Sequence, residues 1–165
     1  MTKEQYVDKF YADAKAASDY FGMGLVAILA QGAVESEWGK SYSATNRKNL
    51  FGMTSRGQKG PKAGGKHTPN EYWKGLDSMS SVSQLWFRIY PTHRDSIFDF
   101  VRNVRVKQPG AFKVSSNVDL YANVIAYKSN YIDPANGDNR AHYEANIKSA
   151  ARSIAEILKK KGLLA

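Results

Sequence analysis

A dense run of helix-breaking residues lies near the middle of this 165-residue chain and separates two helical parts. The breakers are Gly52, Gly57, Gly60, Pro61, Gly64, Gly65 and Pro69. Glycine and proline at this density exclude a continuous helix. We therefore predict a single α+β domain over residues 1–165, mainly helical and interrupted by one small β lobe.

Two helices are predicted before this break. The first spans about 3–20, because Thr2 and Gln5 fit a capping box and apolar residues then recur at helical spacing. A turn bracketed by glycines leads to the second helix, over 25–36. The apolar face of this second helix comprises Leu25, Ile28, Leu29 and Gly32.

A β lobe over about 66–90 is predicted after the break. Residues 70–74 and 84–90 are rich in aromatic and strand-forming side chains, and turn-forming residues occupy 75–83 between them. This pattern predicts a hairpin. A cleft between the helical part and this lobe is the expected place for an extended polymer to bind.

Three helices are predicted after Pro91. The first ends at Pro109, the second is capped by Asn117, and a turn around Gly137 precedes the last. Their predicted apolar faces comprise, in order, Ile97, Val101 and Val104; Leu120, Val124 and Tyr127; and Tyr143, Ile147, Ala150, Ile154 and Leu158.

Glu35 lies on the apolar face of the second predicted helix, seven positions after Ile28 and close to the C-terminal end. At about 100° per residue, seven positions make almost two full turns. Burial and the negative end of the helix dipole both disfavour a charged carboxylate, so we expect a raised pKa for Glu35. Glycoside hydrolysis uses a protonated carboxyl of this kind as general acid. The alternative is a glutamate that reaches solvent or pairs with an arginine.

Several segments of the chain resemble the glucosaminidase family, glycoside hydrolase family 73, which includes flagellar-rod peptidoglycan hydrolases and autolysins. The similar segments are 30–39, 49–52, 70–72, 87–90 and 131–134. The most specific is Asn49-Leu50-Phe51-Gly52, which matches the Asn-Leu-Phe-Gly motif of the family. The resemblance runs from about 20 to 157, with an apparent insertion before Tyr143.

The resemblance implies a lysozyme-like fold and an endo-β-N-acetylglucosaminidase that cleaves the glycan strand of peptidoglycan. Glu35 would be the general acid, and Glu71 would be a second carboxylate on a β-lobe strand. Tyr131 would orient a water or the acetamido group of the substrate. The structural alternatives are an exposed strand glutamate at Glu71 and a tyrosine packed beneath a turn at Tyr131. A substrate-assisted mechanism would reduce the need for Glu71.

The resemblance also implies a set of substrate-binding residues. These are Asn49, Phe51, Gly52, Tyr127 and Tyr143. An amide can bind an N-acetyl group, and an aromatic ring can stack on a pyranose. The alternative for Phe51 is a core anchor of the loop, and helical spacing makes both tyrosines good core residues.

The sequence also allows other functions. A muramidase or lytic transglycosylase of the same fold would cut the other glycosidic bond, and a non-catalytic module would only bind cell wall. His67, His93 and His142 show no metal-ligand spacing, and the chain has no cysteine, so we expect no metal and no cofactor.

The formal net charge of +9, from 24 basic and 15 acidic residues, favours a polyanionic partner such as nucleic acid, anionic lipid or the bacterial cell wall. The alternative is a solvated surface without a polyanionic partner. No basic helix or RNA-binding aromatic signature indicates nucleic acid, and no apolar run is long enough for a membrane span. The first residues do not begin a signal peptide. We expect a monomer that acts in the cell wall or periplasm as a phage-borne, specially secreted or excised domain. An immunity protein would be a partner of a secreted toxin.

Overall fold

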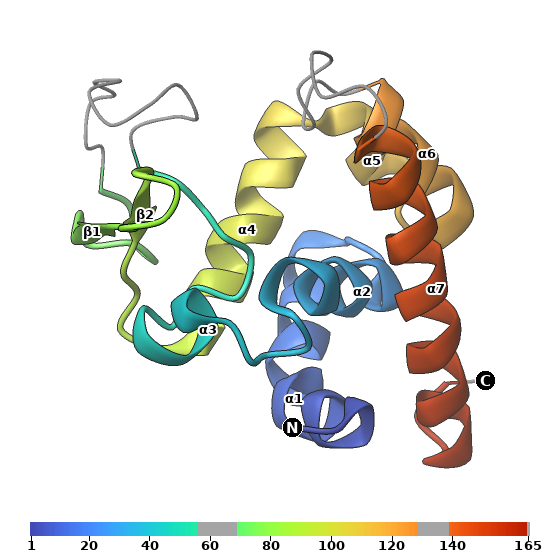
Figure 1. The fold of residues 1–165 in the computed structure, drawn as a ribbon. Helices are drawn as coiled ribbons and strands as arrows, with labels where there is room; N and C mark the ends of the chain where they lie inside the picture. The colour runs from blue at the N-terminus through green and yellow to red at the C-terminus, as the bar shows by residue number, and fades with distance from the viewer. Residues whose placement is uncertain (56–68, 129–138, 165) are drawn as a thin grey trace.

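The computed structural model of the chain describes residues 1–55, 69–128 and 139–164, and within these ranges it contains seven helices and two strands (Figure 1). In chain order they are α1 (Lys3–Phe21), α2 (Leu25–Ser36), α3 (Tyr42–Asn46), β1 (Asp77–Met79), β2 (Trp86–Arg88), α4 (His93–Lys107), α5 (Pro109–Lys113), α6 (Val118–Tyr127) and α7 (Asn139–Lys160). The predicted α+β, mainly helical fold with a small hairpin is confirmed.

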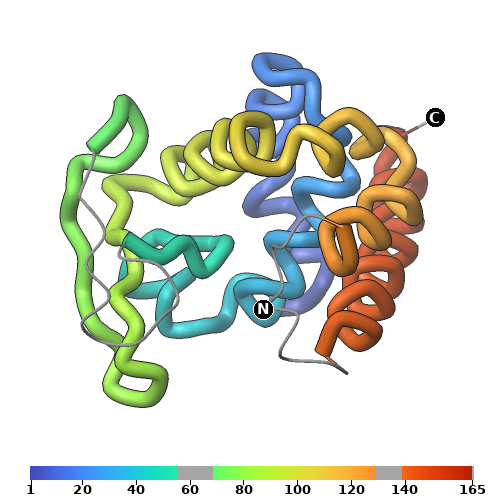
Figure 2. The backbone as a smooth tube through the Cα atoms, turned by 90° about the horizontal axis from the view of Figure 1, so that it is seen from above, coloured from blue at the N-terminus to red at the C-terminus, as the bar shows by residue number. Residues whose placement is uncertain are grey.

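Helix α2 is the centre of the helical part. It packs against α1, α6 and α7, and Figures 1 and 2 show it enclosed between α1 and α7. Its sequence is almost entirely apolar or small, which allows close approach on every side. The buried residues are Ala27, Ile28, Leu29, Ala30, Gln31, Gly32, Ala33 and Ser36. The two fully buried polar residues of this helix, Gln31 and Ser36, are therefore held in a packed, water-poor environment.

The predicted helix ends are mostly confirmed. Thr2 and Gln5 form both hydrogen bonds of a capping box, and the side chain of Asn117 caps α6. The second helix has the predicted bounds, and the predicted apolar stripe of the last helix faces the core. Two short helices were not predicted: α3, capped by Ser41, and α5, which begins at Pro109.

The predicted apolar face of α6 was wrong. Leu120 is 51% exposed and Tyr127 is 39% exposed, whereas the side that packs on α2 and α7 carries Tyr121, Ile125 and two alanines. The helix has apolar residues on two sides, so periodicity alone did not distinguish them. The alanines allow α7 to approach closely.

The predicted hairpin exists, but its first strand was placed wrongly. Strand β1 lies at Asp77–Met79, inside the predicted turn, and pairs antiparallel with β2, so that Ser78 faces Phe87. Residues 70–74 form no strand. The side-chain oxygen of Asn70 accepts hydrogen bonds from the backbone N–H groups of Tyr72 and Trp73 and bends the chain there.

Buried Asp99 of α4 anchors the β lobe to the helical part. Its carboxylate accepts hydrogen bonds from Arg88 Nη1 at 2.7 Å, Tyr90 Oη at 2.5 Å and Asn70 Nδ2 at 2.9 Å. Arg102 adds a second guanidinium. Both the strand β2 and the bend at Asn70 are thus fixed to α4.

Candidate active site

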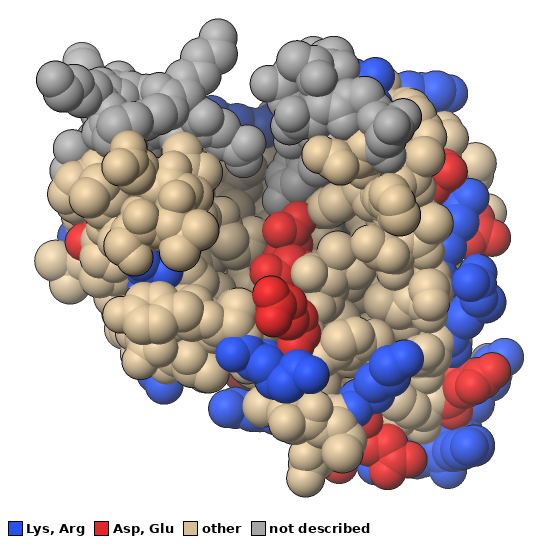
Figure 3. Space-filling model, in the orientation of Figure 1, with Lys and Arg blue, Asp and Glu red and all other residues tan. Residues whose placement is uncertain are grey.

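A groove of about 830 Å³ separates the end of α2 from α3 and the hairpin. Figure 3 shows the hollow between the two halves of the molecule, with acidic side chains along it. The described residues that line it are Glu35, Ser41, Tyr42, Ser43, Arg47, Gly52, Thr54, Ser78, Met79, Ser80, Ser81, Val82, Ser83, Leu85 and Phe87. Among these residues Glu35 is the only acidic one and Arg47 is the only basic one. On the hairpin side, serine hydroxyls are the most numerous polar groups.

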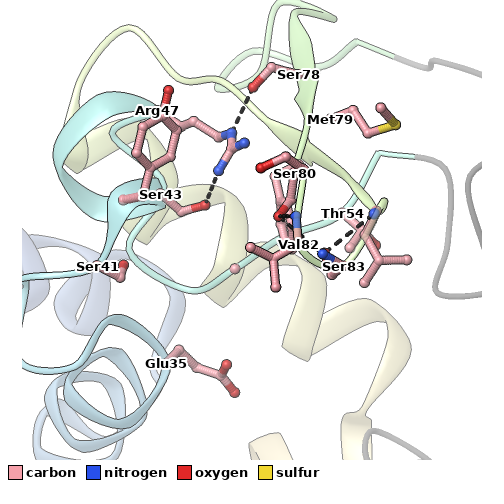
Figure 4. Close-up of a pocket in the computed structure, with 15 residues that line it drawn as sticks. Glu35, Ser41, Ser43, Arg47, Thr54, Ser78, Met79, Ser80, Val82 and Ser83 are labelled. Atoms are coloured by element: carbon pink, nitrogen blue, oxygen red, sulfur yellow. Dashed lines mark hydrogen bonds between the residues drawn. The ribbon is translucent and has the colours of Figure 1, made fainter.

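Glu35 lies in the last turn of α2, and its carboxyl group points towards the groove (Figure 4). Burial raises the pKa of this carboxyl to about 7, although the hydrogen bond from Tyr143 lowers it. A group with this pKa is largely protonated in mildly acidic solution and ionises near neutrality. The predicted rise in pKa is therefore present, and desolvation is its main cause.

A chain of hydrogen bonds from the core fixes the orientation of Glu35. Tyr121 Oη donates to Gln31 Oε1, Gln31 Nε2 donates to Tyr143 Oη at 2.9 Å, and Tyr143 Oη donates to Glu35 Oε1 at 2.5 Å. Because Tyr121 occupies the amide oxygen of Gln31, the amide nitrogen faces Tyr143. The Tyr143 hydroxyl accepts from this nitrogen and directs its own proton to the carboxyl group.

The Asn49–Gly52 loop places backbone beside Glu35. The side chain of Asn49 accepts from Met53 N and donates to Met53 O and Arg88 O, which closes the loop and ties it to β2. Gly52 has a φ of 63°, and a Cβ added there would lie 3.8 Å from Glu35 Oε2. The Gly52 backbone therefore lies close to the carboxyl group, and both residues line the groove.

The packing of this loop requires another glycine. A Cβ at Gly32 would lie 2.6 Å from Tyr6 Oη and 3.2 Å from Leu50 and Phe51 side-chain atoms. The loop therefore approaches α2 at the turn before Glu35. Phe51 stacks on Phe100 of α4 with 3.8 Å between ring centroids.

The structure separates the predicted substrate-binding residues into two groups. Gly52 and Tyr143 lie beside Glu35. Asn49 and Phe51 are buried, and their side chains serve the loop and the core, which favours the structural alternative for Phe51. Tyr127, at the end of α6, is not among the residues of the groove wall.

The predicted second carboxylate lies outside the described groove wall. Glu71 lies in an exposed bend and not in a strand, because the first strand of the hairpin begins only at Asp77. Burial, together with a hydrogen bond to Glu71, raises the pKa of neighbouring Tyr72 to about 12. Tyr131 falls outside the described residues.

Sequence reasoning missed the residues that support the acid and form the far wall. Gln31 and Tyr121 were not singled out, although a glutamine one turn before Glu35 in an apolar helix is a recognisable signal. Arg47 and Tyr42 were also missed, as was the serine-rich hairpin tip. Only the fold brings α3 and the hairpin to the same groove.

The described wall of the groove is not basic, because it carries one acidic and one basic side chain. In Figure 3 lysines and arginines are most numerous at the lower and right margins of the face. No helix within the described ranges is both long enough and apolar enough to cross a membrane. In those same ranges no three His, Cys, Asp or Glu side chains come together as a metal site.

Comparisons with known proteins give a consistent picture. The family model described as mannosyl-glycoprotein endo-β-N-acetylglucosaminidase matches residues 11–163. A comparison with curated protein sequences gave no significant match.

Three solved structures illustrate the shared fold. The glycoside hydrolase domain of FlgJ from Salmonella typhimurium is 19% identical with a TM-score of 0.69, covering 98% of this chain and 94% of that one. A chain of a type VI secretion system effector–immunity complex from Pseudomonas protegens is 18% identical with a TM-score of 0.63, covering 93% and 94%. The catalytic domain of the autolysin Auto from Listeria monocytogenes is 19% identical with a TM-score of 0.60, covering 96% and 88%.

Proposed function

The chain belongs to the glucosaminidase family, and we propose that it is an endo-β-N-acetylglucosaminidase that hydrolyses the glycan strand of peptidoglycan, with Glu35 as general acid. The observation that carries this proposal is a carboxyl group with a pKa of about 7 at the side of a long open groove. Peptidoglycan is the substrate class because the similar FlgJ domain is a glycoside hydrolase and a peptidoglycan hydrolase from Sphingomonas shares the fold.

The first chemical step follows from the position of Glu35. The protonated carboxyl donates its proton to the glycosidic oxygen as the bond between that oxygen and the anomeric carbon breaks. The leaving sugar gains a hydroxyl group and Glu35 becomes a carboxylate. Tyr143 donates a hydrogen bond to that carboxylate and stabilises it.

Two routes complete the reaction, and they differ in the need for Glu71. In one route Glu71 activates water or stabilises the positive charge at the anomeric carbon, while Tyr131 orients the water. In the other route the acetamido oxygen of the substrate attacks the anomeric carbon, and water opens the resulting ring. A Glu71→Gln variant separates them, because only the first route predicts a loss of rate comparable to that of Glu35→Gln.

Mass spectrometry of digested peptidoglycan tests the proposal. Purified peptidoglycan is treated with wild type and Glu35→Gln, and the new reducing ends are reduced with borohydride and identified. N-acetylglucosaminitol ends from the wild type only are the expected result. Muramic or anhydro-muramic ends would identify a muramidase or lytic transglycosylase. No new ends from the wild type would indicate a cell-wall-binding module.

A partner protein is proposed for one biological setting. A chain of an effector–immunity complex shares this fold, so an enzyme of this kind delivered as a toxin would need an inhibitor in the producing cell. The net charge of +9 favours an acidic inhibitor. Co-purification with the product of an adjacent gene, and loss of hydrolysis in its presence, would support this setting. With or without such a partner, we propose that the enzyme acts in the cell wall or periplasm, where the proposed substrate is found.

A further inference from the structure

Arg47 is a nearly buried cation in the wall of the groove, on the side facing the hairpin. Arg47 is 5% exposed and follows directly after α3. Its backbone oxygen accepts a hydrogen bond from Tyr90 N, which fixes the main chain at this point. The groove that Arg47 lines is the one that contains Glu35, and Figure 4 shows the two residues on opposite sides of it.

The contacts of the Arg47 guanidinium orient it without neutralising it. Nε donates to Ser78 Oγ and Nη1 donates to Ser43 Oγ, both at 2.7 Å. The rings of Tyr42 and Phe87 lie 4.8 and 5.2 Å from the guanidinium carbon. All four partners are uncharged, and Nη2 donates no hydrogen bond to any described residue.

The guanidinium groups of Arg88 and Arg102, near the base of the lobe, are paired differently. Arg88 and Arg102 both contact the carboxylate of Asp99. Burial lowers the pKa of Arg47, and no carboxylate among the described residues compensates it. A cation held away from water without a counter-ion is costly unless a ligand supplies the negative charge. Its preorganised geometry suits a planar anion.

The proposed substrate offers such an anion at only one kind of sugar. N-acetylglucosamine is neutral, whereas muramic acid carries a lactyl group that ends in a carboxylate or in a peptide stem with carboxylates of its own. We propose that Arg47 binds a carboxylate carried by the muramic acid residue that lies in the groove between Glu35 and the hairpin. This inference rests on the proposed function and names the specificity determinant of the same groove.

Tyr42 would complete this subsite. Its side chain is exposed and lines the groove, while one ring face is covered by the Arg47 guanidinium. The other face is available to a pyranose ring. A sugar stacked on Tyr42 would place its substituents towards the serine hydroxyls of the hairpin.

Binding and cleavage of chemically modified glycan strands test the inference. Strands freed of peptide stems carry lactyl carboxylates, and carbodiimide amidation converts these to neutral amides. Affinity is measured by calorimetry in the Glu35→Gln background, and kcat/KM is measured with active enzyme. We expect Arg47→Gln to reduce the preference for carboxylate over amide strands by about 10–100-fold, mainly through KM. Lys48→Gln, an exposed neighbouring cation outside the groove wall, is the matched control.

The outcomes separate this inference from the proposed function. Wild type that binds and cuts carboxylate and amide strands equally well would overturn the role of Arg47 and leave the glucosaminidase activity intact. Cleavage of neither strand, together with carboxylate-dependent binding, would overturn the proposed function only. Strands with intact stems distinguish the source of the carboxylate, because amidation of the stem alone abolishes the preference if the stem supplies it. If Arg47→Gln does not fold, the wild-type comparison and Arg47→Lys, which keeps the charge without the planar fork, still decide the question.

Discussion

The two sides of the groove are built in different ways. On the helical side, Glu35 is held by a continuous chain of buried hydrogen bonds that begins at Tyr121 in the core. On the hairpin side, the described wall is formed by serines and exposed apolar residues, and Arg47 is the one buried cation among these described residues. The difference indicates that the chemistry of the site depends on the packed core, whereas the selection of the substrate depends on the surface of the lobe.

The largest effect is expected at the acid itself. Glu35→Gln keeps the shape of the side chain, but its amide cannot act as an acid, so kcat on peptidoglycan should fall by about 10³-fold or more. Release of reducing ends measures the change. The matched control is Glu37→Gln, an exposed neighbour in the same segment, which should retain activity within about twofold. Equal losses in both variants would argue against a special role for Glu35.

The next largest effect is expected where the two regions join. Asp99→Ala removes the buried carboxylate that binds Arg88, Tyr90 and Asn70, and these three side chains lose a charged hydrogen-bond acceptor in a buried position. We expect a loss of about 3–5 kcal/mol in the free energy of unfolding, measured by urea denaturation. A loss under about 1 kcal/mol would show that the lobe is attached mainly by apolar packing.

Glu35→Gln should also change the free energy of unfolding, by an amount that depends on pH. The pKa of Glu35 in the folded protein, about 7, lies above its unfolded value, so the folded state binds the proton more tightly. The resulting stabilisation is complete below the unfolded pKa and is lost as the pH rises to about 7. Above pH 7, Glu35→Gln should therefore be more stable than wild type by about 2–3 kcal/mol, and below pH 4 the two should be similar. Melting curves at both pH values measure the difference.

A smaller effect is expected one step along the chain of hydrogen bonds. Tyr143→Phe removes the donor that favours the ionised form of Glu35, so the pKa of Glu35 should rise. The fall of kcat/KM on the basic side of the pH profile should move to higher pH, and the maximum should drop by about tenfold. Tyr6→Phe is the matched control. The buried Tyr6 hydroxyl donates to Leu29 O of α2, the helix that carries Glu35, and forms no hydrogen bond with Glu35. An unshifted profile in Tyr143→Phe would contradict the proposed role of its hydroxyl.

The smallest effect is expected at the hairpin tip. Val82 is 94% exposed and lines the groove, so Val82→Ser removes little packing. The free energy of unfolding should change by less than about 0.5 kcal/mol, and KM by less than about threefold. Denaturation and steady-state kinetics measure both. A loss above about 1 kcal/mol would show that the tip packs on the rest of the groove wall.

The same contrast explains why the helical part could be predicted from the sequence more accurately than the lobe. In the helical part, local signals sufficed: the capping box at Thr2, the apolar spacing and the position of Glu35 seven residues after Ile28 all depend on residues close in the chain. In the lobe, the aromatic residues at 72 and 73 suggested a strand. Tyr72 instead packs on Phe98 of α4, Trp73 is buried under the Arg88 guanidinium, and Asn70 turns the chain.

Other features of the site were not predictable because they join distant segments. Gln31 meets Tyr143 across 112 positions, and Arg47 meets Ser78 across 31. A polar residue in an apolar helix indicates that a partner exists, but only the fold identifies that partner. The roles of Glu71 and Tyr131 remain predictions from the resemblance.

The most direct test of the central claim is the titration of the Glu35 carboxyl group. The protein is labelled with ¹³C at glutamate side chains, and carboxyl chemical shifts are followed by NMR from pH 4 to pH 9. The signal absent from Glu35→Gln identifies the residue. A midpoint near 7 in the wild type, moving upward in Tyr143→Phe, is the predicted result. A midpoint below about 5 would contradict a buried, protonated acid at this site.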